Sequence, residues 1–246
     1  MRKTASIILA AGKGTRMQSE KPKVVFELAG VPMINRVIET AEKIHSDLIT
    51  VVVGYKKDVV IDIATKSDKI KFAEQKEQNG TGHAVMITES VFADFDGDVF
   101  ILCGDVPLLR YETLEKMLVH HRDTKAACTV LTAVMDDALK YGRIVRNTDG
   151  NVQKIVEFKD SNEEQLAIKE INTGIYCFDA KSMFSALKNV GNTNNQNEYY
   201  LTDTLEILNN NNEIVTSVIL VDMVEASGVN SVEQLADLEK EFFKRG

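Results

Sequence analysis

The sequence predicts an α/β protein whose central sheet is mostly parallel and partly mixed. In the first half of the chain, short apolar runs alternate with amphipathic segments, and glycine follows the runs at 5–10, 48–53 and 99–102 closely. Buried parallel strands joined by crossover helices produce this alternation. After about residue 126 the apolar runs follow one another more closely, which indicates antiparallel pairing. The length of 246 residues suits one domain or two merged lobes.

In the first half, we expect strands and helices in turn. The expected strands are 5–10, 48–53, 70–73 and 99–102, and the expected helices are 32–44, 57–65, 81–91 and 108–121. The helix at 32–44 carries Ile34, Val37 and Ala41 on one face. Pro32 suits its first turn, because an N–H at that position would have no intrahelical partner.

The second half is expected to pair partly antiparallel. The expected strands are 128–134, 143–146, 152–158, 171–178 and 214–221, and the expected helices are 200–208 and 232–243. Between two of these strands stands Asn-Thr-Asp-Gly at 147–150, a sequence typical of a hairpin turn.

Composition excludes several classes of protein. A net charge of −8 disfavours nonspecific nucleic-acid binding, so an anionic ligand needs a local cationic site or a metal. The three cysteines predict neither a disulfide framework nor a zinc site, and a reducing cytoplasm fits them. The apolar run at 7–11 is too short for a signal peptide. No run approaches the roughly 20 apolar residues that cross a membrane.

A glycine-rich segment, Leu-Ala-Ala-Gly-Lys-Gly-Thr-Arg-Met at 9–17, directly follows the first expected strand. Its glycines let backbone N–H groups approach phosphate oxygens, and Lys13, Arg16 and Lys23 can neutralise a polyphosphate. It is neither a P-loop nor the dinucleotide fingerprint, which would have a third glycine in place of Met17. The alternative interpretation is a glycine turn with solvated charges.

Asp105 follows the buried strand at 99–102, within Gly-Asp-Val-Pro-Leu at 104–108. This position is at the carboxyl edge of the sheet, where open α/β folds bind their ligands. A carboxylate is a hard oxygen ligand that suits Mg²⁺. The alternative, a cap on the next helix, is weakened by Pro107, which separates Asp105 from the helix start.

The segment Gln-Asn-Gly-Thr-Gly-His-Ala at 78–84 is a weaker candidate. Gly80 lets the backbone approach a flat ring and Thr81 can cap the helix that follows, but a plain helix start explains both equally well. We expect His83 to pack or cap rather than to act as a general base. A protein nucleophile has no support in the sequence, and phosphoryl transfer needs none, because positioning and charge neutralisation supply most of the acceleration.

Taken in order, the motifs resemble one family. Besides the segments at 9–17, 22–23, 80–84 and 104–108, the chain has Tyr-Gly-Arg-Ile at 141–144, Glu-Phe-Lys-Asp at 157–160, Glu-Ile-Asn-Thr-Gly-Ile at 170–175, Glu-Tyr-Tyr-Leu-Thr-Asp at 198–203 and Gly-Val-Asn at 228–230. Over roughly 5–240 this set resembles the N-terminal uridylyltransferase domain of the bacterial bifunctional N-acetylglucosamine-1-phosphate uridylyltransferase/glucosamine-1-phosphate acetyltransferase. The first motif is shared by many sugar nucleotidyltransferases, and the later set is more specific.

The resemblance implies a Rossmann-like, three-layer nucleotide-diphospho-sugar transferase fold. One domain, 1–246, would have a nucleotide-binding lobe at about 1–108, a sugar-binding lobe at about 109–230 and a C-terminal helix at 231–246. The implied enzyme is cytoplasmic and serves nucleotide-sugar and cell wall biosynthesis. It would transfer a uridylyl group from UTP to N-acetylglucosamine 1-phosphate, with Mg²⁺ assisting in-line attack on the α-phosphorus and pyrophosphate leaving.

The same resemblance assigns roles to individual residues. Arg16 and Lys23 would be the catalytic cations on the phosphates, and Asp105 and Asn230 would bind Mg²⁺. The contacts to nucleotide and sugar would come from Leu9, Ala10, Ala11, Gly12, Gln75, Gly80, Thr81, Cys103, Gly104, Gly142, Glu157 and Asn172.

Three departures from the family pattern matter. The sequence ends at Gly246, so the acetyltransferase domain and its trimer are expected to be absent, leaving a monomer or a dimer. Cys103 stands where the family often has an aromatic residue, and Ser227 replaces an acidic one. The alternatives are a related nucleotidyltransferase, for instance for glucose 1-phosphate and dTTP, or a nucleotide-sugar-binding protein without turnover.

Overall fold

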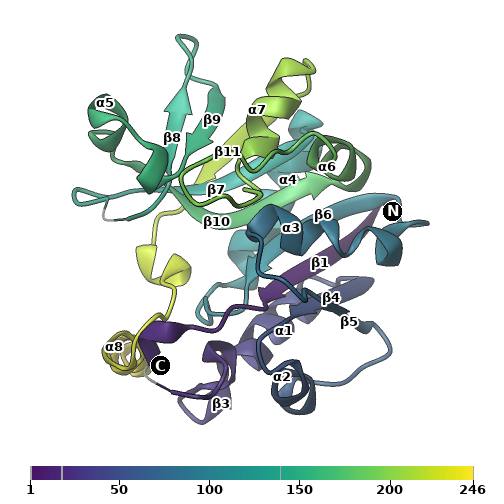
Figure 1. The fold of residues 1–246 in the computed structure, drawn as a ribbon, viewed down its shortest axis with the longest axis vertical. Helices are drawn as coiled ribbons and strands as arrows, with labels where there is room; N and C mark the ends of the chain where they lie inside the picture. Colours follow the sequence, from purple (N-terminus) through teal and green to yellow (C-terminus); the bar gives the residue numbers. More distant parts are fainter. Residues whose placement is uncertain (1, 18, 139, 246) are drawn as a thin grey trace.

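A computed structural model describes residues 2–17, 19–138 and 140–245. The strands of its main sheet are β1 (Lys3–Ala10), β4 (Leu48–Val53), β5 (Ile70–Glu74), β6 (Gly97–Cys103), β7 (Cys128–Val134), β8 (Arg143–Arg146), β9 (Val152–Val156), β10 (Glu170–Asp179) and β11 (Val215–Ile219). Within the described residues this nine-stranded sheet has the order β11-β7-β10-β6-β1-β4-β5 (Figure 1). β8 joins it beside β10 and pairs with β9, while β2 (Glu27–Leu28) and β3 (Val31–Pro32) form a separate hairpin.

Strand direction puts several loops at one edge of the sheet. β5, β4, β1 and β6 run parallel, and β11 runs parallel to β7. β10 is antiparallel to both of its neighbours, β6 and β7. The first residues of β10 therefore lie at the same edge of the sheet as the carboxyl ends of β6 and, one strand further, β1. The predicted sheet, mostly parallel and partly mixed, is confirmed.

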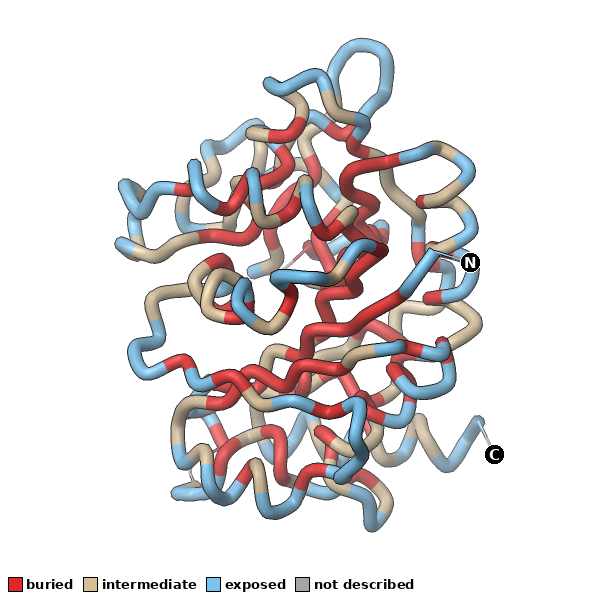
Figure 2. The backbone as a smooth tube through the Cα atoms, turned by 90° about the vertical axis from the view of Figure 1, so that its right-hand side faces the viewer, coloured by how far each residue is buried: buried red, intermediate tan, exposed pale blue. Residues whose placement is uncertain are grey.

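Helices cover both faces of the sheet. They are α1 (Met33–Lys43), α2 (Lys57–Ile63), α3 (Thr81–Met86), α4 (Tyr111–Thr124), α5 (Glu163–Leu166), α6 (Ala180–Leu187), α7 (Asp203–Asn210) and α8 (Val232–Lys244). Side chains alternate along β6, so that Phe100 and Leu102 join one core with α1, α2 and α4. Val99 and Ile101 join the other core, with α3, α6 and α7. Figure 2 shows the buried strands running through the middle of these three layers.

Most of the predicted elements are present, with shifted ends. β4, β7 and β8 have the predicted limits, and the turn at 147–150 joins β8 to β9, with Gly150 at φ +82° donating to Asn147 O at 3.0 Å. The helix predicted at 108–121 begins only at Tyr111. Leu109 is buried in the loop before this helix, so the apolar pattern starts earlier than the helix does. The helix predicted at 200–208 begins at Asp203.

One further prediction was wrong in detail, and one helix lies outside the predicted elements. The helix predicted at 81–91 ends at Met86 and is followed by a separate 3₁₀ turn, Glu89–Phe92. α6 was not predicted at all, although Asp179 caps it by accepting from Ser182 N at 2.9 Å. That capping signal and the apolar residues behind it were readable in the sequence.

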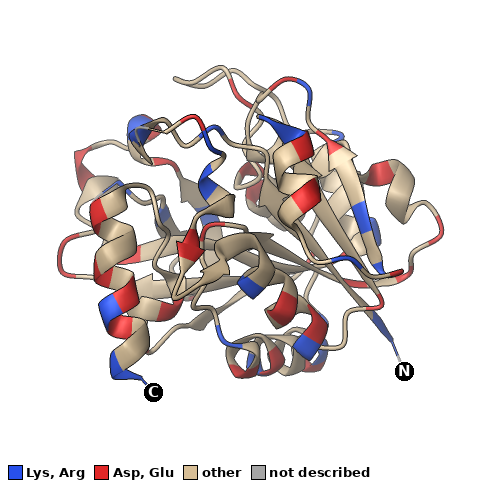
Figure 3. Cartoon of the chain, turned by 90° about the horizontal axis from the view of Figure 1, so that it is seen from below, with Lys and Arg blue, Asp and Glu red and all other residues tan. Residues whose placement is uncertain are grey.

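The C-terminal helix α8 lies away from the main sheet and packs beside β2 of the small hairpin (Figure 1). Its Leu238 packs with Met17, Leu28 and Val229 in a small core of their own. Acidic and basic positions are interspersed along α8 (Figure 3). The helix matches the predicted one closely, and Gly246 lies outside the described residues. In the described part of the chain, no helix has the length and apolar character required to cross a membrane. Because the sheet is continuous, the division into two lobes stays a prediction.

Candidate functional site

The loops that leave β1 and β6 are in direct contact at the carboxyl edge of the sheet. Gly104 N donates to Leu9 O at 3.0 Å. A Cβ on Gly104 would lie 3.1 Å from that oxygen and 3.1 Å from a methyl carbon of Val24. A larger residue would push the loops apart, so Gly104 serves this close approach. Asp105 is the next residue and is held at the edge by the same contact.

Gly12 and Gly14 have different physical reasons to be glycine. Gly12 is exposed, and a Cβ there would meet no atom within 4 Å, so the fold itself tolerates a side chain. The open space next to its backbone suits a ligand that approaches N–H groups closely. Gly14 has φ +66°, and a Cβ there would lie 2.6 Å from Lys23 Cβ. Gly14 is therefore needed where Lys23 packs.

Lys23 connects the two predicted metal ligands. It lies in the 3₁₀ turn Lys23–Val25, and its ammonium bonds to the carboxylate of Asp105 and donates to Asn230 Oδ1 at 2.9 Å. Asn230 reaches this point because Val229 N donates to Asp105 O at 2.9 Å. The side chains of Lys23 and Asp105 are 16% and 19% exposed, so the charges are shielded but reachable.

The donor set fits a magnesium ion bound together with a ligand. A carboxylate and an amide oxygen converge on one cationic nitrogen, which marks a point that attracts positive charge. Mg²⁺ usually takes one or two protein ligands and completes its shell with phosphates and water. The described residues contain no cluster of three or more His, Cys, Asp or Glu that would cage an ion. Asp105 and Asn230 therefore suit an ion that would complete its shell with phosphate and water.

Neighbouring groups respond to the Asp105 charge. Burial, and after it the Asp105 carboxylate, raises the pKa of the Cys103 thiol to about 12. The same two causes raise the pKa of Tyr141. Because the thiol stays protonated near neutral pH, Cys103 is not a nucleophile here. It instead contacts the strand opposite, where its Sγ lies 3.5 Å from Gly174 O.

Gln75, Gly80 and Thr81 form a second group, next to the carboxyl ends of β4 and β5. Gln75 is buried, and its Nε2 donates to Gly80 O at 3.1 Å. Gly80 has φ +102°, and a Cβ there would lie 2.6 Å from Tyr199 O. Thr81 does not cap α3, because Gly80 is the N-cap and the Thr81 hydroxyl accepts from Leu201 N at 3.2 Å. The predicted cap is therefore wrong, and Thr81 instead links the start of α3 to the segment that contains Leu201.

Gly142, Glu157 and Asn172 form a third group, at the start of β8, the end of β9 and the start of β10. Asn172 N donates to Gly142 O at 2.9 Å, and a Cβ on Gly142 would lie 3.5 Å from Glu157 Oε2. Burial raises the pKa of Glu157, while a hydrogen bond from Thr202 opposes the rise. Gly174, at φ +81°, accompanies an irregularity in β10 pairing and donates to Asn172 Oδ1 at 2.9 Å.

Arg16 is not brought to the Lys23–Asp105 pair. It lies exposed in the turn Thr15–Met17. Lys13 is also exposed, with its ammonium 5.4 Å from the centre of the Tyr55 ring. Leu9 and Ala10 are the last residues of β1, and Ala11 follows them. The roles assigned to all of these residues stay predictions.

Two contacts at the site were missed by sequence reasoning. Thr202 Oγ1 donates to Glu157 Oε1 at 3.2 Å, and Asn172 Nδ2 donates to Tyr176 OH at 2.7 Å. From the sequence, Tyr176 is expected only to be a core residue of its strand. Thr202 belongs to a motif that pointed to the family, and nothing in that motif indicates its partner 45 residues away.

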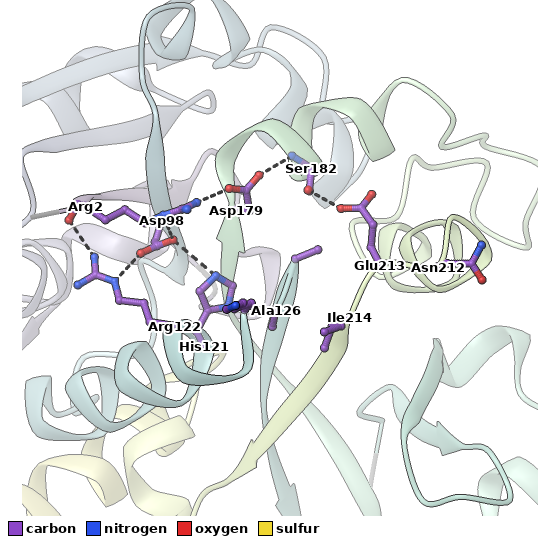
Figure 4. A pocket seen from close by; sticks show the side chains of 12 residues that line it. Arg2, Asp98, His121, Arg122, Ala126, Asp179, Ser182, Asn212, Glu213 and Ile214 are labelled. Carbon is purple, nitrogen blue, oxygen red and sulfur yellow. Dashed lines mark hydrogen bonds and ion pairs between the residues drawn. The ribbon is translucent and has the colours of Figure 1, made fainter.

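A separate polar cavity of about 560 Å³ lies at the opposite end of β6 (Figure 4). Buried Asp98 is bonded there by Arg2 Nε and Arg122 Nε, both at 2.7 Å. His121 Nε2 is 3.7 Å from the same carboxylate. These charges satisfy one another and are remote from Asp105, so the network is explained by stability alone.

Fold and site together define an α/β protein with a mostly parallel central sheet, in which a glycine-lined edge of the sheet faces a carboxylate and an amide. The family model for nucleotidyl transferases matches residues 5–223, and the chain belongs to this family. It is 46% identical over 240 residues to the bifunctional protein GlmU of Geobacillus sp. strain WCH70, covering 98% of this chain and 52% of that protein.

Other comparisons agree. The bifunctional protein GlmU of Exiguobacterium sibiricum is 47% identical over 240 residues, covering 98% of this chain and 53% of that protein. The chain thus spans about half the length of the curated relatives it matches. A crystal structure of UDP-glucose pyrophosphorylase complexed with UDP-glucose shares the fold, with a TM-score of 0.78, 19% identity and complete coverage of both chains. An apo structure of UDP-glucose pyrophosphorylase gives a TM-score of 0.81 at 18% identity, covering 100% of this chain and 99% of the other.

Proposed function

We propose that this chain transfers a uridylyl group from UTP to N-acetylglucosamine 1-phosphate, forming UDP-N-acetylglucosamine and pyrophosphate. The observation that carries the proposal is the convergence of Lys23, Asp105 and Asn230, with Lys23 packed against Gly14 of the glycine-rich loop. A binding protein without turnover has little need for a carboxylate and an amide arranged around a cation. The identity to GlmU proteins over nearly the whole chain supports the choice of substrates.

Each group of residues has a separate task in this proposal. Backbone N–H groups around Gly12 receive the triphosphate, with Arg16 and Lys23 neutralising its charge. Gln75, Gly80 and Thr81 hold the base. The surface between the triphosphate and the base is formed by five residues: Leu9, Ala10, Ala11, Cys103 and Gly104.

The sugar phosphate enters from the other side of β10. Gly142, Glu157 and Asn172 hold the N-acetylglucosamine moiety, so that its phosphate oxygen faces the α-phosphorus. That oxygen attacks, the bond from the α-phosphorus to the bridging oxygen breaks, and pyrophosphate leaves with the electron pair. Mg²⁺ held by Asp105 and Asn230 would stabilise the negative charge that develops. Placing both substrates in one orientation supplies much of the acceleration, so no protein nucleophile takes part.

A substrate panel tests the proposal. Purified chain with Mg²⁺ is incubated with UTP, dTTP or CTP and with N-acetylglucosamine 1-phosphate or glucose 1-phosphate, and pyrophosphate release is measured. We expect the fastest release from UTP with N-acetylglucosamine 1-phosphate. Faster release from dTTP with glucose 1-phosphate would indicate the related transferase. No release from any pair, in a chain that still binds UDP-N-acetylglucosamine, would indicate a binding protein.

A further inference from the structure

Gln75 holds its side chain firmly at the edge of the proposed base site. It is the first residue after β5, and its N–H donates to Val53 O at 2.8 Å. The residue is 3% exposed. A side chain that leaves a paired strand end is better fixed than one on a free loop.

The hydrogen bonds of Gln75 determine which way its carboxamide points. Nε2 lies 3.1 Å from Gly80 O and 3.2 Å from His83 Nδ1. A carbonyl oxygen can only accept, so the amide nitrogen, not the amide oxygen, must face Gly80. The second hydrogen of that nitrogen is then donated to His83 Nδ1, which has to carry a lone pair. Nδ1 of His83 is therefore the acceptor of this hydrogen bond.

His83 is itself held in place from behind. It is the third residue of α3, and the preceding residue, Gly82, donates its N–H to Tyr199 O at 2.8 Å. A Cβ on Gly82 would lie 2.8 Å from the same oxygen, so this packing needs glycine. The His83 and Tyr199 rings are 6.3 Å apart between centroids. The imidazole is thus a fixed acceptor for Gln75.

The oxygen of the Gln75 carboxamide remains available. Among the described residues, no N–H or O–H donates to Oε1. Oε1 is also not among the fully buried side-chain atoms that lack a hydrogen-bond partner. It is therefore an acceptor with solvent contact. Uracil and thymine carry a hydrogen on N3 that such an acceptor can bind, whereas N3 of cytosine is itself an acceptor.

We propose that His83 is a positioning residue that, through Gln75, selects a pyrimidine with a hydrogen on N3 over cytosine. The inference rests on the proposed function, because it places the base of the nucleotide beside Gln75. His83 touches no substrate in this arrangement. It keeps both hydrogens of the amide turned inward, so that the oxygen is presented to the base.

Replacing His83 by Leu tests the inference. The amide nitrogen keeps its bond to Gly80 O but loses its second acceptor, so the carboxamide is held less firmly and its oxygen is less well placed for the base. We expect KM for UTP to rise about three- to tenfold, which matches the loss of one hydrogen bond. The value of kcat for UTP stays nearly constant, and the UTP to CTP ratio of kcat/KM falls by a similar factor. An unchanged ratio in a folded, active His83→Leu variant would overturn the inference.

His83→Asn distinguishes positioning from simple packing. The Oδ1 of Asn can stand where Nδ1 of the imidazole stood and accept from Gln75, so we expect UTP selectivity to return to within about twofold of the wild type. If His83 acted only in packing, the KM values for UTP and CTP would rise in parallel in His83→Leu, and His83→Asn would restore neither value. Calorimetry of UMP and CMP binding to the wild type, His83→Leu and His83→Asn measures the preference for uracil over cytosine in the absence of turnover. Wild-type protein that prefers UMP over CMP but releases no pyrophosphate would refute the proposed function and leave His83 supported.

Discussion

The ammonium of Lys23 bonds to the carboxylate of Asp105, although the two residues are 82 positions apart in the chain. Asn230 Oδ1 accepts from the same ammonium at 2.9 Å. The Lys23 ammonium therefore occupies the position next to both oxygen ligands proposed for Mg²⁺. It must move away before an ion can contact both oxygens. The phosphates of UTP offer the ammonium another partner. We thus expect nucleotide and metal to bind together more readily than the metal alone.

Lys23→Met changes metal binding and turnover in opposite directions. Without the ammonium, the Asp105 charge is unneutralised, so affinity for Mn²⁺ in the absence of nucleotide should rise about tenfold or more. Turnover should fall at least about a hundredfold, since a lost transition-state charge contact costs about 3–4 kcal/mol at comparable sites. Electron paramagnetic resonance of free Mn²⁺ measures the first, and pyrophosphate release the second.

Lys21→Met is the matched control, because Lys21 is exposed and lies two residues away. It should change neither quantity appreciably. Mn²⁺ affinity that stays at the wild-type value in Lys23→Met would show that the lysine does not compete with the metal.

Asp105→Ala should abolish turnover while the fold stays intact. The substitution removes a partly exposed carboxylate and spares the backbone bond to Val229. Circular dichroism and the thermal midpoint check the fold, and Asp149→Ala in the exposed β8–β9 turn controls for loss of one surface charge. Near-normal pyrophosphate release from Asp105→Ala would refute the metal role.

Gly12→Ala should weaken UTP binding without changing stability. The added methyl group meets no protein atom, so the unfolding midpoint should match the wild type. It would occupy the space proposed for the phosphates, and KM for UTP should rise about tenfold or more, equivalent to about 1.4 kcal/mol. Gly191→Ala, where a Cβ also meets nothing within 4 Å, should leave KM unchanged. Equal KM values in both variants would place the triphosphate elsewhere.

His121 should make the protein less stable in mild acid. Burial lowers its pKa from 6.5 to about 4, although Asp98 opposes this shift. The unfolded chain therefore takes up the proton first, so the contribution is complete above pH 6.5 and is lost as the pH falls through about 4. The loss amounts to about 3 kcal/mol of the free energy of unfolding at most.

Urea denaturation between pH 4 and 7 measures this slope. His121→Gln removes the titrating group and should flatten the decline. His45→Asn, at an exposed position with φ +57°, should keep the wild-type slope. A decline of equal steepness in His121→Gln and the wild type would assign the acid sensitivity to other groups.

Local patterns were enough to predict much of the fold. The short, nearly continuous apolar runs of β4 and β7 predict their limits, because strands buried on both faces have such runs. α4 begins three residues later than its apolar pattern predicts, since Leu109 is buried without being helical. α6 was overlooked although Asp179 signals its start.

For the site, the sequence by itself determined which residue types stand after which strands: glycines and cations after β1, and a carboxylate after β6. Only the tertiary structure decided that Lys23 bonds to Asp105 and Asn230, and that His83 turns the amide of Gln75. The physical reason is that such contacts depend on the directions of several strands and on two backbone hydrogen bonds between distant loops. Residue spacing along the chain carries no information on either.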